Sequence, residues 1–164
     1  MTNTALEGVR ILVVEDTADV ALGLSEGLRR AGALTVEIKA SARQARRRLE
    51  QEPLPDLVLL DQHITGEETG LDIALWMREQ PALQQIVRVS YSGTNPEDLR
   101  TRCPDDTVFH ALITKPIPIP QLIENWRHCF ILHPATSNKR MPDACEHTAP
   151  SMFFTRLVYA HYYE

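Results

Sequence analysis

The stretch LVLLD at residues 57–61 is a short, uninterrupted apolar run that ends in a carboxylate. Three further runs have the same plan: ILVVED at 11–16, IVRVSYS at 86–92 and ALITK at 111–115. Short apolar runs without alternation of polar and apolar residues are typical of buried strands in a parallel sheet. Residues 35–38 supply a fifth strand. Because helical patterns separate these runs, the sequence predicts an α/β protein with a doubly wound, five-stranded parallel sheet.

Each predicted strand leads into apolar residues at helical spacing. The expected strands cover residues 9–14, 35–38, 57–60, 86–89 or a little beyond, and 108–113. Asn95 followed by Pro96 predicts the start of a short fourth helix, whose single large aliphatic residue is Leu99. A helix with so few apolar residues is expected to be weakly anchored. An apolar stripe over residues 119–130 predicts the last helix.

The polar residues that end the runs are expected to meet at one edge of the sheet. In an open parallel sheet, ligands bind just beyond the carboxyl ends of the strands. Glu15 and Asp16 end one run, and Asp61 ends another. Alone, the first pair is also what the positive end of a following helix favours. Three clustered carboxylates, however, repel one another and supply the oxygen ligands that Mg²⁺ prefers, so the sequence predicts a divalent-cation site here.

Asp61 is also the candidate nucleophile. A carboxylate can attack a phosphoryl group to form an aspartyl-phosphate, and such a transfer depends on positioning and on charge neutralisation. Lys115, at the end of its run, offers an ammonium for one phosphoryl oxygen. Ser92 offers a hydroxyl for another, and Gly93 leaves room beside it. Asp61, Lys115 and Ser92 are therefore the predicted catalytic set.

The chain resembles the receiver domain of a two-component response regulator over residues 8–132. The resemblance rests on four motifs in this order: VVED at 13–16, LLD at 59–61, SG at 92–93 and TKPI at 114–117. It implies a flavodoxin-like fold with the strand order 2-1-3-4-5. The family acts by Mg²⁺-dependent transfer of a phosphoryl group from a phosphohistidine on a sensor histidine kinase, with Mn²⁺ as a substitute.

The resemblance also assigns roles to single residues. Asp61 matches the phosphorylated residue, and the backbone carbonyl of His63 would complete a metal shell with the three carboxylates. Ser92 matches a residue that switches position on phosphorylation. The bond between Lys115 and Pro116 matches a lysine-proline pair that is usually cis, which is a rare conformation.

Some positions depart from the family pattern. Thr65 stands four residues after the phosphoacceptor, where proline is common. Leu112 stands at the switch position three residues before the lysine, where an aromatic often turns inward on phosphorylation. Phe109 or His110 would either replace that aromatic or simply pack in the core. His63 either influences attacking water or is a solvent-facing loop residue.

The leading hypothesis is a stand-alone receiver that acts by phosphorylation-dependent protein binding and is not an enzyme with a separate substrate. Two signalling alternatives stay open: a shuttle that passes phosphate to a histidine phosphotransfer protein, and a scaffold that is not phosphorylated. A phosphatase of the haloacid dehalogenase type would need an aspartate at His63. A dinucleotide-binding oxidoreductase is excluded because no glycine-rich turn follows the first strand.

Composition limits the other classes. A chain of 164 residues with 43% hydrophobic residues makes one main domain the expectation. Its net charge of −5 argues against nucleic acid as a partner. The three cysteines lack metal-ligand spacing and are expected to be reduced thiols. The N-terminus lacks a signal pattern and no run is long enough for a membrane span, so we expect a cytoplasmic protein without a membrane partner.

Residues 133–164 are expected to form a C-terminal extension to the receiver domain. A pattern compatible with one helical face contains Phe153, Phe154, Leu157, Val158 and Tyr162. Large aromatic side chains left in water often mark interaction surfaces. We expect this arm to mediate self-association or docking of a partner, and we favour a homodimer because two-fold dimers dominate soluble oligomers. An arm that folds back on its own domain, or a frayed terminus, are the alternatives.

Overall fold

Five parallel strands form one sheet in the order β2-β1-β3-β4-β5 in the computed structural model, which describes residues 6–132. The predicted flavodoxin-like topology is confirmed. The elements are β1 (Arg10–Val14), α1 (Ala18–Arg30), β2 (Thr35–Lys39), α2 (Ala42–Leu49), β3 (Leu57–Leu60), α3 (Gly70–Glu79), the 3-10 helix η1 (Pro81–Leu83), β4 (Val87–Ser92), α4 (Pro96–Arg102), β5 (Ala111–Thr114) and α5 (Ile119–Leu132). The expected C-terminal extension lies outside the described residues.

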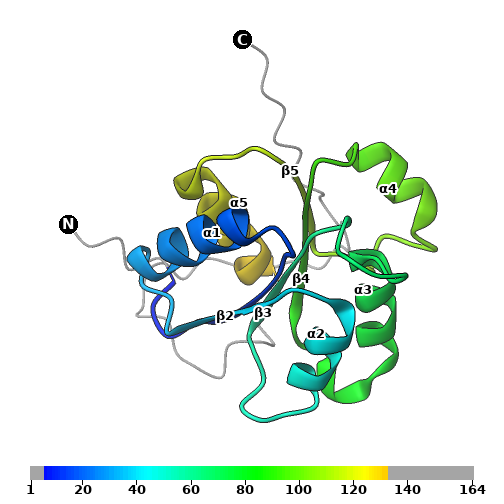
Figure 1. Ribbon diagram of the computed structural model, residues 1–164, viewed down its shortest axis with the longest axis horizontal. Helices are drawn as coiled ribbons and strands as arrows, with labels where there is room; N and C mark the ends of the chain where they lie inside the picture. The colour runs from blue at the N-terminus through cyan, green and yellow to red at the C-terminus, as the bar shows by residue number, and fades with distance from the viewer. Residues whose placement is uncertain (1–5, 133–164) are drawn as a thin grey trace, which may run out of the picture.

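Two hydrophobic cores lie on the two faces of the sheet. Successive side chains of a strand point to opposite faces, so each inner strand contributes to both cores. Val13 of β1 packs in the core with α1 and α5, whose Trp126 is fully buried. Leu12 of β1 packs in the opposite core with α2, α3 and α4. Figure 1 shows α1 and α5 together on one side of the sheet. This double burial explains why the strands read as continuous apolar runs.

The last two strands differ from their expected bounds. β4 extends to Ser92, and β5 begins at Ala111 rather than at Val108. Val108 and Phe109 are buried although they precede the strand. The guanidinium of Arg88 on β4 is also buried, and its Nε donates to the carbonyl of Val108 at 2.8 Å. Side-chain packing and this hydrogen bond, rather than pairing with a neighbouring strand, hold Val108 and Phe109 in position. An apolar pattern alone does not distinguish these two cases.

The strand β2 forms an edge of the sheet. The carbonyl of Lys39 accepts a hydrogen bond from the amide of Glu15 at 3.0 Å. Backbone groups alternate along a strand, so the carbonyl of Val36 faces the open side. A guanidinium nitrogen of Arg29 on α1 donates to that carbonyl at 2.9 Å. Just beyond the strand, the side chain of Gln44 accepts a hydrogen bond from the amide of residue 40 at 3.0 Å.

The short helix α4 begins as the sequence predicts. The side chain of Asn95 accepts a hydrogen bond from the amide of Glu97 at 2.9 Å and caps the helix. Pro96 occupies the first helical turn, where its missing amide hydrogen has no cost. Leu99 is the buried residue of this helix. One apolar side chain therefore carries most of the packing of α4.

Candidate functional site

Three carboxylates meet beyond the carboxyl ends of β1 and β3. The parallel register sets Val14 beside Leu60, so the residues that follow these strands emerge together. One carboxylate oxygen from each of Glu15, Asp16 and Asp61 lies within 4.8 Å of the others. Glu15 and Asp61 are buried, whereas Asp16 is partly exposed. The structure thus brings together the three acids that the sequence nominates.

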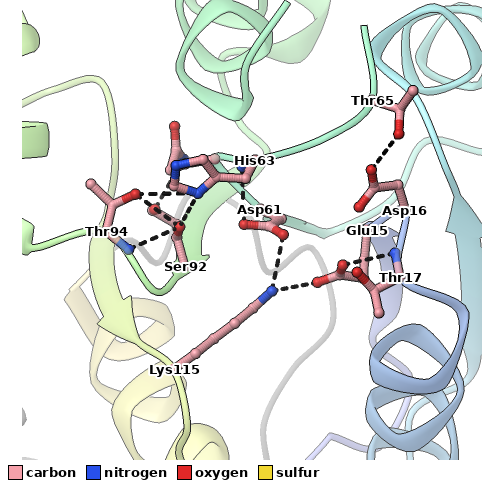
Figure 2. Close-up of polar contacts among 11 residues, drawn as sticks. Glu15, Asp16, Thr17, Asp61, His63, Thr65, Ser92, Thr94 and Lys115 are labelled. Carbon is pink, nitrogen blue, oxygen red and sulfur yellow. Dashed lines mark hydrogen bonds and ion pairs between the residues drawn. The ribbon is translucent and has the colours of Figure 1, made fainter.

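Lys115 follows β5 and reaches two of these carboxylates (Figure 2). Its Nζ donates to Glu15 Oε2 at 2.5 Å and to Asp61 Oδ2 at 3.0 Å. Burial on its own lowers the pKa of Lys115, but the hydrogen bonds to Glu15 and Asp61 outweigh burial and raise the pKa above its ordinary value. The ammonium is therefore charged at neutral pH. It lies 5.1 Å from the ring centre of Tyr91, within cation–π range. The peptide bond between Lys115 and Pro116 is cis.

Asp16 is hydrogen-bonded by the loop between β3 and α3. The hydroxyl of Thr65 donates to Asp16 Oδ2 at 2.5 Å. This hydrogen bond is the main reason that the pKa of Asp16 lies below its ordinary value; slight burial opposes the effect, and the charge of Lys115 adds to it. Asp16 is therefore ionised at neutral pH and can act as an anionic ligand.

Ser92 and His63 lie on the other side of Asp61 (Figure 2). The hydroxyl of Ser92 is 3.1 Å from Thr94 Oγ1, and it accepts a hydrogen bond from the Thr94 amide at 3.2 Å. The backbone amide of His63 donates to Asp61 Oδ1 at 3.2 Å. The Nδ1 atom of His63 lies 3.5 Å from the hydroxyls of Ser92 and Thr94. The imidazole is exposed and yet close to the switch hydroxyl, so its influence on attacking water stays a prediction.

Gln62 and Gly70 pack close to each other beside Asp61. Gln62 is buried, and its Nε2 donates to Ser90 Oγ on β4 at 3.0 Å. Gly70 at the start of α3 packs against the phosphoacceptor candidate itself. A Cβ atom at residue 70 would lie 2.3 Å from the Asp61 carbonyl oxygen and 2.9 Å from Gln62 Nε2. Only glycine therefore permits this close approach without a backbone shift.

Leu112 lies in the core that β5 shares with α4. It is buried there, and Phe109 and Leu99 pack in the same core. The Nδ1 atom of His110 accepts a hydrogen bond from the Arg88 amide at 2.9 Å. Phe109 and His110 therefore both have structural contacts. Whether Leu112 moves with Ser92 on phosphorylation stays a prediction.

The donor set fits a hard divalent cation. Three carboxylates carry three negative charges, and Lys115 contributes one positive charge. Two negative charges remain for a divalent cation to balance. The atoms offered are all oxygens, and the backbone carbonyl of His63 is an additional candidate in the segment just after Asp61. Oxygen donors of this kind suit Mg²⁺ and Mn²⁺ better than softer metals.

Several contacts of the site are not predicted from the sequence. In the sequence, Thr65 is only a departure from a family proline, and no pattern marks Tyr91 or Thr94. Tyr91 and Thr94 flank Ser92, so their closeness to a motif residue was the available signal. The hydroxyl of Thr65 was visible in the sequence, but its partner Asp16 lies 49 residues away along the chain. A side chain that bridges two loops leaves no local pattern.

Comparisons with known proteins agree with this geometry. Residues 11–127 match the family model of the response regulator receiver domain. A search of curated proteins finds no match for the chain. None of the helices in the described part of the chain is long and apolar enough to cross a membrane.

Several solved structures share the fold. The phosphorylated cyanobacterial phytochrome response regulator RcpA is 23% identical with a TM-score of 0.62, and the match covers 82% of this chain and 99% of that chain. A CheY-like receiver domain protein from Methanospirillum hungatei JF-1 is 20% identical with a TM-score of 0.67, covering 77% and 97%. The Mn²⁺-bound response regulator Rcp1 is 19% identical with a TM-score of 0.59, covering 82% and 99%. At these identities the likeness shows the fold alone.

Proposed function

Because this chain belongs to the response regulator receiver domain family, we propose that Asp61 accepts a phosphoryl group from a phosphohistidine of a sensor histidine kinase. The arrangement around Asp61 carries this proposal. Its Oδ1 accepts a hydrogen bond from the His63 amide, and its Oδ2 accepts one from Lys115. Both contacts fix the orientation of the carboxylate before a donor arrives, and preorganisation of this kind lowers the barrier to reaction.

The proposed chemistry uses the residues of this site, a divalent cation held by its carboxylates, and the donor. An oxygen of Asp61 attacks the phosphorus atom, and the bond between phosphorus and the donor imidazole nitrogen breaks. The leaving nitrogen keeps the electron pair. Lys115 and Ser92 then contact two of the phosphoryl oxygens, the first through its ammonium and the second through its hydroxyl. Their present hydrogen bonds, to carboxylates and to Thr94, are the ones they would exchange.

We assign the carboxylate cluster to Mg²⁺, with Mn²⁺ as a substitute. Glu15, Asp16 and Asp61 would hold the cation, together with the backbone carbonyl of His63. When bound, the cation supplies positive charge for the phosphoryl oxygens that face it. Glu15 is the least accessible of the three, with a side chain that is 1% exposed and already paired with Lys115. Asp16 is the most open, so it is the acid best placed to bind the metal first.

Phosphorylation is proposed to signal through protein binding rather than through turnover of a substrate. The Ser92 hydroxyl would leave Thr94 for a phosphoryl oxygen, and the segment that leads into α4 would move with it. Leu112 lies in the core next to this helix, so a shift of α4 would change its packing. The surface of α4 and β5 would then present a different shape to a partner.

The direct test is phosphorylation of the full chain with a small phosphodonor and Mg²⁺, followed by intact mass. We expect one added phosphoryl group in the unchanged protein and none in Asp61→Asn. The exposed Asp106 makes a matched control, because Asp106→Asn also removes one carboxylate but lies outside the site. Its labelling should equal that of the unchanged chain.

Chelation provides the second arm of this test. EDTA present during the incubation should prevent labelling of the unchanged protein, because the carboxylate cluster is proposed to need a divalent cation. Labelling that persists in Asp61→Asn would refute the assignment of the phosphoacceptor. Labelling that is the same with and without EDTA would refute the metal requirement alone.

A further inference from the structure

Thr65 makes a contact that the proposed chemistry has not used. Its hydroxyl donates to Asp16 Oδ2 at 2.5 Å, from the loop between β3 and α3 (Figure 2). Glu15 and Asp61 are both held by Lys115. Within the described part of the chain, Thr65 is the side chain that hydrogen-bonds Asp16. The acid most open to solvent is therefore oriented by a different residue from the other two.

The loop around Thr65 is fixed on both sides. Ile64, just before it, is buried in the core with α2, α3 and α4. Gly66, just after it, has a φ of +124°, a conformation that other residues rarely adopt. Further on, Glu68 is paired with Arg46 of α2. A hydroxyl held between such anchors keeps its position without a large loss of side-chain freedom when the hydrogen bond forms.

The far end of the loop is anchored as well. Arg46, which pairs with Glu68, lies 4.6 Å above the ring of Trp76 on α3. Thr69 and Asp72 form reciprocal hydrogen bonds that cap the start of α3. The loop therefore has defined contacts at its start and at its end, and Thr65 lies between them. A hydroxyl held on such a loop can fix the direction of the Asp16 carboxylate.

We propose that Thr65 is a positioning residue for the divalent cation and that it holds the Asp16 carboxylate in the orientation that binds the metal. Partners that hydrogen-bond a metal ligand orient it and raise the affinity of the site. Asp16 Oδ2 accepts the hydrogen bond from Thr65 and still has a lone pair for a metal. The other carboxylate oxygen, Oδ1, does not take part in this hydrogen bond. The inference rests on the proposed metal site of Glu15, Asp16 and Asp61.

The test measures binding of Mn²⁺ alone to the full chain, by the electron paramagnetic resonance signal of free Mn²⁺. Thr65→Val keeps the shape of the side chain and removes the hydroxyl, and we expect affinity to fall about tenfold, the lower end of the range for such partners. Thr65→Ser restores the hydroxyl and should stay within about twofold of the unchanged chain on the same grounds. Thr65 is exposed, so these variants should fold. If Thr65→Val has a lower melting temperature than the unchanged chain, Thr65→Ala provides a second variant that lacks the hydroxyl.

Two controls make the result specific. Thr101→Val removes an exposed threonine hydroxyl on α4 that bonds the carbonyl of Asp98, and it should leave Mn²⁺ affinity unchanged. Asp16→Ala removes the acceptor of this hydrogen bond, so in that background Thr65→Val should cause no further loss of Mn²⁺ affinity.

Each alternative outcome has one meaning. If the unchanged chain binds no Mn²⁺, the metal site of the proposed function fails, and this inference fails with it. If the unchanged chain binds and Thr65→Val binds equally or more tightly, Thr65 does not assist the metal and only this inference is overturned. If Thr65→Ser is as weak as Thr65→Val, the hydroxyl is not the group that matters, and the inference is again overturned.

Discussion

Lys115 stabilises two neighbouring carboxylates that would otherwise repel each other. Glu15 has a side chain that is only 1% exposed, and a buried charge is tolerated when it is paired and hydrogen-bonded. Its Oε2 accepts from Lys115, and its Oε1 accepts from the amide of Thr17 at 3.0 Å. Asp61 shares the same ammonium. Lys115 thus connects Glu15 and Asp61, whereas Asp16 is hydrogen-bonded by the loop residue Thr65.

Gly70, which packs against the Asp61 carbonyl, gives a prediction for a single residue. Gly70→Ala should lower the free energy of unfolding by about 1–3 kcal/mol, because its Cβ would clash with the Asp61 carbonyl and force overpacking. Gly23→Ala in α1 is the matched control, since no atom lies within 4 Å of a Cβ there. It should raise stability by about 0.5–1 kcal/mol. Urea unfolding measures both values. An equal effect of the two substitutions would show that residue 70 is not sterically restricted.

Single residues were predictable where they end a strand. Glu15, Asp16 and Asp61 could be placed together from the parallel sheet alone, because the ends of neighbouring parallel strands adjoin. The hydrogen bond of Thr65 was not predictable, since it depends on the path of a loop. The buried guanidinium of Arg88 was also unexpected; its partners are backbone carbonyls, which any sequence supplies. Burial lowers the pKa of Arg88 to about 10.

Among the helices, α4 differs from its neighbours in how it is anchored. It has seven residues, one of them buried, whereas α3 has ten residues, five of them buried. Local opening costs less where few apolar contacts must be broken. The helix contacts β5 and begins at Pro96, shortly after Ser92, the residue expected to respond to phosphorylation. A weakly held element next to the site is suited to change position.

Leu99 should therefore control the local stability of α4. Leu99→Ala is expected to lower global stability by about 2–5 kcal/mol, as for other buried leucines. Amide exchange in α4 should increase first, before that of β1. Leu22→Ala makes the control, because Leu22 on α1 is 63% exposed and its removal should change neither quantity much. If exchange rises equally in α4 and β1, the helix does not open separately from the rest of the domain.

The elements were predicted better than their bounds. Strand and helix order follow from the alternation of apolar runs and helical stripes, and the structure confirms that order. β5 was placed too early because Val108 and Phe109 are apolar, although they are buried outside the sheet. An apolar pattern records burial, and it does not record whether the backbone pairs with a neighbouring strand.

At the scale of the whole molecule, the family match ends at residue 127 of a chain of 164. We expect residues 133–164 to support a homodimer. Truncation after Leu132 should remove self-association, because the aromatic residues of that segment would no longer be present to form an interface. Light scattering of both chains, with and without beryllofluoride as a phosphoryl mimic, measures this. The same oligomeric state in all four samples would contradict the prediction.

The edge at β2 has a consequence for behaviour in concentrated solution. An open sheet edge can accept a strand from another chain, which is the first step of ordered aggregation. Here the outward carbonyl of Val36 is already taken by Arg29, and the amide of residue 40 is already taken by Gln44. An incoming strand could not pair with the Val36 carbonyl or with the amide of residue 40. It would also approach the charge of Lys39, which lies between these two positions in the chain. The sheet can therefore contain fully apolar strands while its β2 edge is a poor template for an added strand.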